Sequence, residues 1–577
     1  MVSLVQLRER KLVRWGLAYL AGAWLALQVL NLVADRFGWP DAWLRGLIVV
    51  LGVGFFAALV VAWYHGERGE QRVSGVELAL LAGLLVVAGA AVALVGPDGT
   101  GARPEPAVPL AAVAAPVEQA SIAVLPFENL SADPDQEFFS DGLTEELLNA
   151  LAQVPGLRVA ARTSAFTFKG ADATADSIGR ALRVAHLVEG SVRRAGGRVR
   201  ITAQLVDART GLGQWSQSYD REIADVFAVQ DEIGRAIAGE LSVRVGSGPL
   251  VAEATADPEA HALFLRASQV RRVGGPPSAF LPEAERLFEA ALARDPGYAA
   301  ALAGLAEVHQ TGAYFGLTPK EAGYERAQAE AERALALDPD GATAHAVLGR
   351  IEDSYNRDYA SAAARYRRAL ELNPSDARTR SSYGWLLMRL GRTAEALREG
   401  QRAVELDPLS PGALTNLGSL YAYADEPERA AEQSLAALAL SPENPVILGN
   451  LAFIYADLGQ PAEAVRTAER ALAADPEGAF SLTSAGYVYG RAGRRAEAER
   501  ARDRLAALPQ ASPYLLATVA MGLGDRERAF GLLERAVAEG DDKVVDLGMD
   551  PVFVPLRGDP RFARLLDRLG LPAPGAR

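Results

Sequence analysis

The chain has 577 residues, enough for several domains, and its 59 Lys+Arg against 72 Asp+Glu give a formal net charge of −13. A general nucleic-acid binder needs a basic surface, so this acidic balance argues against that class. Cysteine is absent, which excludes disulfide scaffolds, thiol catalysis, Fe–S clusters and cysteine-based zinc sites. None of the four lysines follows a glycine, so the Gly-Lys-Ser/Thr sequence of a nucleotide P-loop is excluded as well.

The first 97 residues contain three long uncharged apolar runs, at 15–34, 46–64 and 78–97. About 20 apolar residues in a helix are long enough to cross a hydrocarbon core of about 30 Å. Tryptophans stand at the ends of these runs, where their amphipathic rings favour the headgroup level. We therefore expect residues 1–97 to form a three-helix transmembrane anchor rather than a cleavable signal peptide.

Lysine and arginine are unevenly divided between the two sides of this predicted anchor. Six lie at the N-terminus and in the second loop, and three lie in the first loop and after the third run. Positive residues favour the cytoplasmic side, so the predicted location is the bacterial inner membrane, with a cytoplasmic N-terminus and periplasmic C-terminal domains. Residues 98–120 are rich in alanine and proline and are expected to form a semi-rigid linker.

Residues 121–245 alternate strand-like and helix-like segments, which predicts a small α/β domain. Strands are expected at 121–127, 157–162 and 214–222, and helices at 138–154, 174–184 and 225–241. Residues 186–211 alternate apolar and polar side chains on both sides of Ala195-Gly196-Gly197, which predicts a β-hairpin.

Residues 121–243 contain, in this order, SIAVLPFENLS, FFSDGLTEELLNAL, ARTSAFTFKG, LVEGSVRRAGGRVRITAQLVDARTG and WSQSYDRE. This series resembles the TolB amino-terminal-like domain of bacteria along its whole length. The resemblance implies a noncatalytic protein-interaction module, in a family often fused to tetratricopeptide repeats and sometimes to a nucleotide cyclase or a winged-helix DNA-binding domain. It supplies no catalytic residue to carry over. Because the first predicted span begins at residue 15, we expect no such output domain ahead of it.

Two groups of charged residues in this domain could bind ions. Asp133, Asp135 and Glu137 offer carboxylates to a hard cation, but they flank a proline without a glycine turn, and we expect a solvated loop. Four arginines of the hairpin could grip a phosphate or an acidic partner, although such residues commonly solvate an exposed strand pair. These arginines are Arg193, Arg194, Arg198 and Arg200.

Proline-ending dipeptides recur through the second half of the chain, with spacings of 43, 35, 34, 34, 34 and 33 residues. The prolines are Pro296, Pro339, Pro374, Pro408, Pro442, Pro476 and Pro509. A 34-residue period closed by proline is the pattern of tetratricopeptide repeats, which are helical hairpins that stack into a superhelix. We expect an array at 257–545 with about six clear repeats and one degenerate repeat, then a C-terminal cap and tail at 546–577. An insertion near 311–325 explains the long first spacing.

The predicted fold class is a membrane-anchored multidomain chain with three transmembrane helices, a small α/β domain and an all-α superhelix. A stacked array curves into a concave groove lined by the first helix of each repeat. The groove positions of the tetratricopeptide family, transferred place by place, give nine candidate partner-binding residues. They are Arg378, Trp385, Arg389, Asn416, Tyr423, Asn450, Phe453, Tyr487 and Arg491. Trp385 and Tyr487 are expected to contribute most, and Asn416 and Asn450 to stack as a pair of amides.

The leading hypothesis for function is a noncatalytic membrane-anchored scaffold or sensor that binds a peptide or protein partner in the groove. The alternative is a regulatory or sensor chain of a signalling system that lacks its own output domain. No Ser/His/Asp constellation, HExxH helix or strand-borne dinucleotide fingerprint occurs, so we expect no enzyme activity. No cofactor, metal or nucleic-acid partner is predicted.

Overall fold

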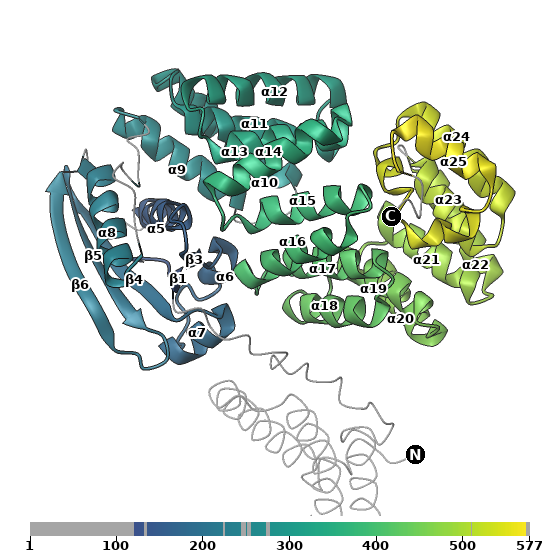
Figure 1. The fold of residues 1–577 in the computed structure, drawn as a ribbon, viewed down its shortest axis with the longest axis horizontal. Coiled ribbons are helices and arrows are strands. Elements are labelled where there is room, and N and C mark those ends of the chain that lie inside the picture. Colours follow the sequence, from purple (N-terminus) through teal and green to yellow (C-terminus); the bar gives the residue numbers. More distant parts are fainter. Residues whose placement is uncertain are drawn as a thin grey trace, which may run out of the picture. The chain divides into compact units, whose positions relative to one another are not determined.

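The computed structural model describes residues 120–572, apart from short gaps at 132–135, 223–224, 244–249, 251–254, 273–276 and 509–510. The three predicted membrane spans and the linker lie outside these residues. Within the described part of the chain, none of the helices combines the length and the apolar character needed to cross a bilayer. The described chain begins with an α/β module and continues as a long series of helix pairs (Figure 1).

The module is built on a mixed sheet in the order β3-β1-β4-β5-β6, with β2 paired to β4 outside this path. The strands are β1 (Ser121–Val124), β2 (Glu128–Asn129), β3 (Arg158–Val159), β4 (His186–Ala195), β5 (Arg198–Asp207) and β6 (Gly213–Glu222). Strand β1 runs parallel to β3 and β4, whereas β4, β5 and β6 form an antiparallel meander. The predicted hairpin is present: Ala195 pairs with Arg198, and Gly196 takes the positive φ that the tight turn requires.

Both faces of strand β1 are buried, because helices cover the sheet on its two sides. Ile122 and Val124 share a core with helices α5 (Glu137–Ala152) and α8 (Val226–Glu240). Ala123 and Leu125 face a second core with α7 (Ala175–Leu182). Two elements differ from the expectation: β2 is a strand that was not predicted, and the strand expected at 157–162 stops at Val159 because helix α6 (Arg162–Phe166) follows it.

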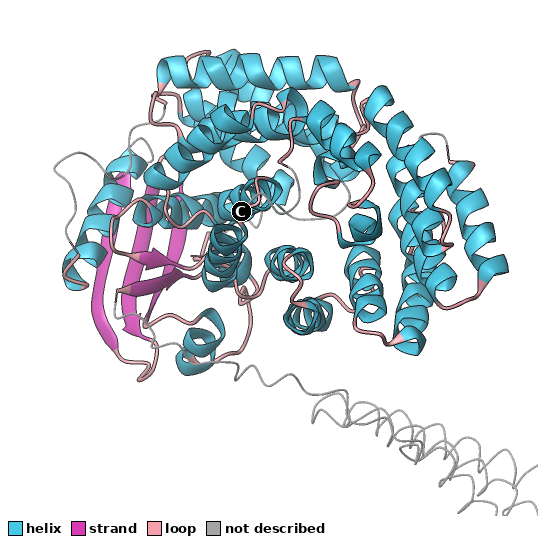
Figure 2. Ribbon diagram, turned by 45° about the vertical axis from the view of Figure 1, so that its right-hand side comes forward, coloured by secondary structure: helices cyan, strands magenta, loops and turns pink. Residues whose placement is uncertain are grey.

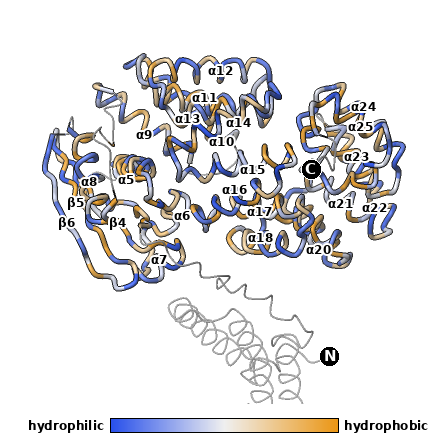
Figure 3. Tube along the Cα trace, in the orientation of Figure 1, coloured by the Kyte–Doolittle hydropathy of each residue, from blue (hydrophilic) through white to orange (hydrophobic). Residues whose placement is uncertain are grey.

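Helix pairs follow the module (Figure 2). Among the described residues there are eight such pairs, where about seven repeats were expected. The pairs are α9 (Pro258–Arg272) with α10 (Pro277–Arg294), α11 (Ala299–Tyr314) with α12 (Lys320–Leu337), α13 (Ala342–Ile351) with α14 (Tyr359–Leu372), α15 (Ala377–Arg389) with α16 (Thr393–Leu406), α17 (Pro411–Tyr423) with α18 (Pro427–Leu440), α19 (Pro445–Asp457) with α20 (Pro461–Ala474), α21 (Ala479–Arg491) with α22 (Arg495–Ala506), and α23 (Pro513–Gly522) with α24 (Arg526–Glu539). Each helix carries both polar and apolar residues, as the hydropathy colouring shows (Figure 3).

Small residues stand where the two helices of a pair cross. A Cβ added to Gly418 would lie 2.9 Å from the Ser434 hydroxyl and 3.2 Å from the Ala430 carbonyl oxygen, so even a methyl group there would require its neighbours to shift. The turn between the helices of a pair needs a left-handed residue, which is Gly459 at φ 68° and Asp425 at φ 64° one repeat earlier. The 34-residue period thus repeats the backbone geometry as well as the apolar pattern.

The second unit of the array, which accounts for the 43-residue spacing, consists of two long helices. Helix α11 runs to Tyr314 and α12 begins at Lys320, so the insertion expected near 311–325 extends both helices around a short connection. A π-helix, η3 (Glu352–Asn356), continues α13 in the next unit. It places Asp353 in a buried position on the inner side of the array.

The chain ends in two 3₁₀ helices, η4 (Asp542–Asp546) and η5 (Pro551–Leu556), and helix α25 (Pro560–Leu569). Phe553, Phe562 and Leu566 are almost completely buried in one cluster with residues of α23 and α24. This segment therefore covers the apolar face of the last pair.

The α/β module contacts the array at two places far apart in sequence. Near the first repeat, Leu265 of α9 belongs to the core of the module, and the Gln269 amide donates to Asp141 of α5 at 3.1 Å. Helix α6 meets the connection between α16 and α17. There the Ser164 hydroxyl donates to the Asp407 carboxylate at 2.6 Å, and the Leu409 N–H donates to the Ser164 oxygen at 2.9 Å.

Replacing Ser164 by alanine tests this second contact. Ser164 is completely buried, and burial raises the pKa of Asp407, so the loss of the hydroxyl leaves a buried carboxylate short of a donor. We expect a cost of about 1–3 kcal/mol at the contact. Hydrogen–deuterium exchange at Leu409 should become faster in Ser164→Ala and stay unchanged in Ser177→Ala, a matched change on exposed α7. Equal exchange at Leu409 in both variants would contradict the contact.

Candidate partner-binding groove

The nine predicted groove residues all lie on the first helices of their pairs, as the repeat period indicated. They come from α15 (Arg378, Trp385, Arg389), α17 (Asn416, Tyr423), α19 (Asn450, Phe453) and α21 (Tyr487, Arg491). The ninth residue of successive first helices falls at equivalent places, and these residues are Glu307, Arg350, Trp385, Ser419, Phe453 and Tyr487. The inner face is therefore one continuous surface that begins two repeats before the first predicted residue.

Trp385 and Asn416 contact each other. The indole N–H of Trp385 donates to the Asn416 side-chain oxygen at 3.4 Å, and its ring meets Tyr423 edge-on with centroids 5.4 Å apart. The Asn416 side-chain oxygen is therefore engaged within the array, and the expected stacking of Asn416 on Asn450 stays a prediction. Trp385 is half-buried, so part of its ring still faces the groove.

Tyr487 differs from the expectation of an accessible binding residue. Its side chain is only 4% exposed, and burial raises its pKa to about 12. Phe453 lies against it with ring centroids 5.1 Å apart, and the exposed Arg491 guanidinium lies 5.9 Å from its ring. Tyr487 therefore belongs to the core between α19 and α21.

The chain's own C-terminal segment, residues 541–556, extends along the inner face from the last helix pair to α15 and α12. Asp546 accepts from Arg389 at 2.9 Å, and Asp542 pairs with Lys320 at the start of α12. Met549 shares a buried cluster against which Trp385 and Tyr423 pack. The predicted groove is thus partly filled by this segment, which the repeat period could not reveal.

Arg389 links this segment to the inner helices. Its guanidinium contacts Asp353 at 2.5 Å and Asp546 at 2.9 Å, and only 13% of its side chain is exposed. Burial opposes its charge, but Asp353 and Asp546 hold its pKa above the ordinary value. Arg389 is therefore a structural ion-pair partner and not a free binding residue.

A pocket of 480 Å³ remains on the inner face beside this segment. It lies between α11, α13, α15 and α17, and Thr163 of α6 also lines it. Its polar lining includes Gln310, Arg350, Arg378, Ser381, Ser382 and Asn416. Tyr314 and Phe315 form an apolar wall, with exposed fractions of 55% and 57%. Of the predicted residues, Arg378, Trp385, Arg389 and Asn416 line this pocket.

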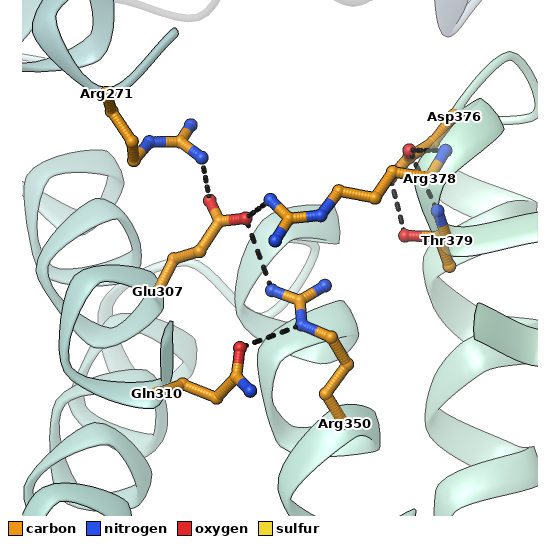
Figure 4. Close-up of polar contacts among 7 residues, drawn as sticks. All are labelled: Arg271, Glu307, Gln310, Arg350, Asp376, Arg378 and Thr379. Carbon is orange, nitrogen blue, oxygen red and sulfur yellow. Dashed lines mark hydrogen bonds and ion pairs between the residues drawn. The ribbon is translucent and has the colours of Figure 1, made fainter. Parts of the chain in front are cut away.

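Behind the pocket, three arginines from three helices converge on one glutamate (Figure 4). Glu307 of α11 is 95% buried and contacts Arg271 of α9 at 2.7 Å and Arg350 of α13 at 3.3 Å. Arg378 of α15 pairs with the same carboxylate. The Arg350 Nε also donates to Gln310 at 3.1 Å. Sequence reasoning missed Glu307 and Arg350, although counting to the ninth place in the two preceding units would have found both.

Several of the other charged groups considered from sequence have local partners. Asp133 and Asp135 lie outside the described residues, and Glu137 pairs with Lys169 at 2.6 Å. Arg198 and Arg200 of the hairpin both pair with Asp220 on β6, so they form a cross-strand charge cluster. Within the described residues, no group of His, Asp and Glu side chains has an arrangement that could hold a metal ion.

Comparison with known proteins identifies the helical part of the chain. Tetratricopeptide repeat models match residues 351–411 and 446–477. With the 34-residue period, these matches confirm that the helix pairs form an array of tetratricopeptide repeats.

A relative from Rhizobium meliloti (strain 1021), named a putative adenylate cyclase 3, is 40% identical over 218 residues. The match covers 37% of this chain and 35% of that relative, so the chain spans about a third of the relative's length.

Two solved structures are similar over parts of the array. PilW, a type IV pilus biogenesis factor, is 24% identical and matches 37% of this chain and 98% of its own, with a TM-score of 0.32. PilF of Pseudomonas aeruginosa is 23% identical and matches 35% of this chain and 90% of its own, with a TM-score of 0.29.

The buried carboxyl of Asp550 gives a prediction for pH dependence. It accepts from the Tyr514 hydroxyl at 2.7 Å and from the Val552 N–H at 2.9 Å, and burial raises its pKa from 3.8 to about 6. Between about pH 4 and 6 the folded state then binds more protons than the unfolded state, so this group's contribution to stability falls as pH rises.

Asp550→Asn keeps the side chain neutral and should remove this contribution. Relative to the variant, wild type should lose about 2 kcal/mol between pH 4.5 and pH 7, seen as a falling difference in melting temperature. Asp503→Asn, at a side chain that is 68% exposed, is the control. Parallel melting curves for wild type and Asp550→Asn would show that Asp550 titrates normally.

Proposed function

We propose that this chain is a noncatalytic, membrane-anchored interaction protein that binds a protein or peptide partner on the inner face of its repeats. The pocket between α11 and α17 is the observation that carries the proposal. It combines half-exposed aromatic residues, arginines and hydroxyl groups on one concave surface. Tetratricopeptide repeats generally serve as partner-binding scaffolds, and the sequence has no recognised catalytic motif.

In this proposal the α/β module, which resembles the TolB amino-terminal-like domain, serves as a fixed support for the repeats. One of its contacts with the array is at Gln269, ahead of the pocket in the sequence, and the other is at Asp407, which lines the pocket. One residue of the module, Thr163, also lines the pocket. A module that shapes a binding surface needs no catalytic group of its own, which agrees with the role proposed for it.

A second function is a sensor or regulatory chain in a signalling system. The observation that favours it is the partial match to a relative named a putative adenylate cyclase. The identity of the captured partner distinguishes the two functions. Recovery of a cyclase or transcription regulator would support the signalling chain, whereas recovery of an envelope or secretion component would support the scaffold.

Trp385→Ala tests the binding function. Aromatic anchors that reach into a groove typically contribute 2 kcal/mol or more to binding, or about thirtyfold in affinity. Capture of partners by the tagged full chain, quantified by mass spectrometry, should fall by about that factor, with helicity preserved in circular dichroism. Leu440→Ala, on an outer helix and 43% exposed, should bind normally. Full helicity with intact capture would end the groove hypothesis, and lost helicity would make Trp385 a core residue.

The proposed topology follows from the distribution of lysine and arginine around the apolar runs of residues 1–97. Alkaline phosphatase fused after Arg577 should be active, because it folds only outside the cytoplasm. A reporter that works only in the cytoplasm should be silent at the same position. The opposite pair of results would place the repeats on the cytoplasmic side.

A further inference from the structure

The C-terminal segment shows what the inner face of the array accepts. It presents aspartates four residues apart, and Asp542 and Asp546 lie against Lys320 of α12 and Arg389 of α15. Apolar residues between and after them, Val544, Leu547 and Met549, are buried against the array. This part of the inner face thus binds an acidic segment with interspersed apolar side chains.

The pocket continues the same inner-face surface beyond Asp546 of η4. Arg389 and Asp353 line the pocket, and Arg389 also pairs with Asp546, so the two sites share a boundary. The carboxylates on the lining have partners of their own. Asp353 pairs with Arg389, and Asp407 accepts from Ser164. Asp353 and Asp407 therefore do not compete with a ligand for Arg350 and Arg378.

The arginine cluster carries more positive than negative charge. Arg271, Arg350 and Arg378 share the single carboxylate of Glu307, and Asp376 is occupied as the N-cap of α15. Burial, followed by repulsion from Arg378, lowers the pKa of Arg350, although an arginine remains protonated in proteins. Counting Asp376, three positive charges face two negative ones. A carboxylate in the pocket would offset the remaining charge.

Arg378 is the accessible member of this cluster, because 56% of its side chain is exposed, against 12% for Arg350. Hydroxyl groups of Ser381 and Ser382 lie on the same helix and line the pocket. Opposite them, Tyr314 and Phe315 meet edge-on with centroids 5.2 Å apart and expose more than half of their surface. The pocket therefore pairs a cationic wall with an aromatic wall.

We propose that this pocket binds an acidic peptide segment of a partner protein, with a carboxylate on Arg378 and Arg350 and an apolar side chain against Tyr314 and Phe315. The proposal rests on the proposed function and names the partner's chemistry. The pocket volume of 480 Å³ lies within the range of about 300–1,000 Å³ that is typical of ligand sites. A nucleic-acid backbone fits less well, because Asp353 and Asp407 also line the site and the body of the chain is acidic.

The test uses the full chain in detergent micelles and three fluorescein-labelled peptides. They are Gly-Asp-Asp-Tyr-Asp-Asp-Gly, its asparagine counterpart and its lysine counterpart. Charge-assisted hydrogen bonds to arginine contribute about 1.5–3 kcal/mol, so the acidic peptide should bind at least about tenfold more tightly than the asparagine peptide. Binding of the acidic peptide, measured by fluorescence anisotropy, should weaken as salt is added.

Arg378→Gln should reduce affinity for the acidic peptide about tenfold and leave the asparagine peptide unaffected, whereas Arg378→Lys should retain most of the binding. Arg398→Gln is the matched control, because Arg398 is a comparably exposed arginine, with 68% of its side chain exposed, on outer helix α16. Glu307 keeps Arg271 and Arg350 in the Arg378→Gln variant, so folding should be preserved, as a melting curve would show.

Several outcomes would overturn the proposal. Equal binding of the acidic and asparagine peptides to wild type would do so even if the Arg378→Gln variant failed to fold. So would full binding by Arg378→Gln, or complete displacement of the acidic peptide by inorganic phosphate at equal concentration. Preference for the lysine peptide would overturn the acidic partner but leave a peptide-binding groove standing, which separates this failure from failure of the proposed function.

Discussion

A helix pair of this array cannot bury its own apolar face, and the rest of the described structure depends on that constraint. Each pair is stable only where a neighbour covers it, so the series must be closed at both ends. At the first end Leu265 of α9 enters the core of the α/β module. At the last end Phe553 and Phe562 lie over α23 and α24. The module and the C-terminal segment therefore cover the two ends of the array.

Buried charge adds a second constraint that acts along the inner face. An ionic group removed from water must be paired, because the cost of leaving it alone is several kcal/mol. Glu307 meets this requirement through arginines of α9, α13 and α15, and Asp353 through Arg389. These pairs join first helices of different repeats. The inner face is consequently held in a fixed shape where the pocket lies, which lowers the entropy that a ligand must lose on binding.

The sequence allowed the periodic features to be predicted, and the reason is local. Glycine or alanine at the crossing points, proline after each second helix and the left-handed turn residue recur every 34 residues, so the helices and the inner positions could be placed. Short elements such as α6 escaped, because five residues carry too little pattern. The partners of Asp407 and Arg389 also escaped, since Ser164 and Asp546 lie more than 150 residues away in the sequence and no local signal marks such contacts.

The contact between Ser164 and Asp407 closes a loop of 243 residues, and this has a consequence for how the chain is made. During synthesis the α/β module emerges first, and it can form its sheet from residues that are already available. Its second docking surface exists only after α16 has been translated. Chains fold by domains as they emerge, so the exposed side of α6 must wait through the synthesis of four further repeats. In that interval Ser164 is open to solvent, and the first repeat, through α9, is the part of the array that can already hold the module.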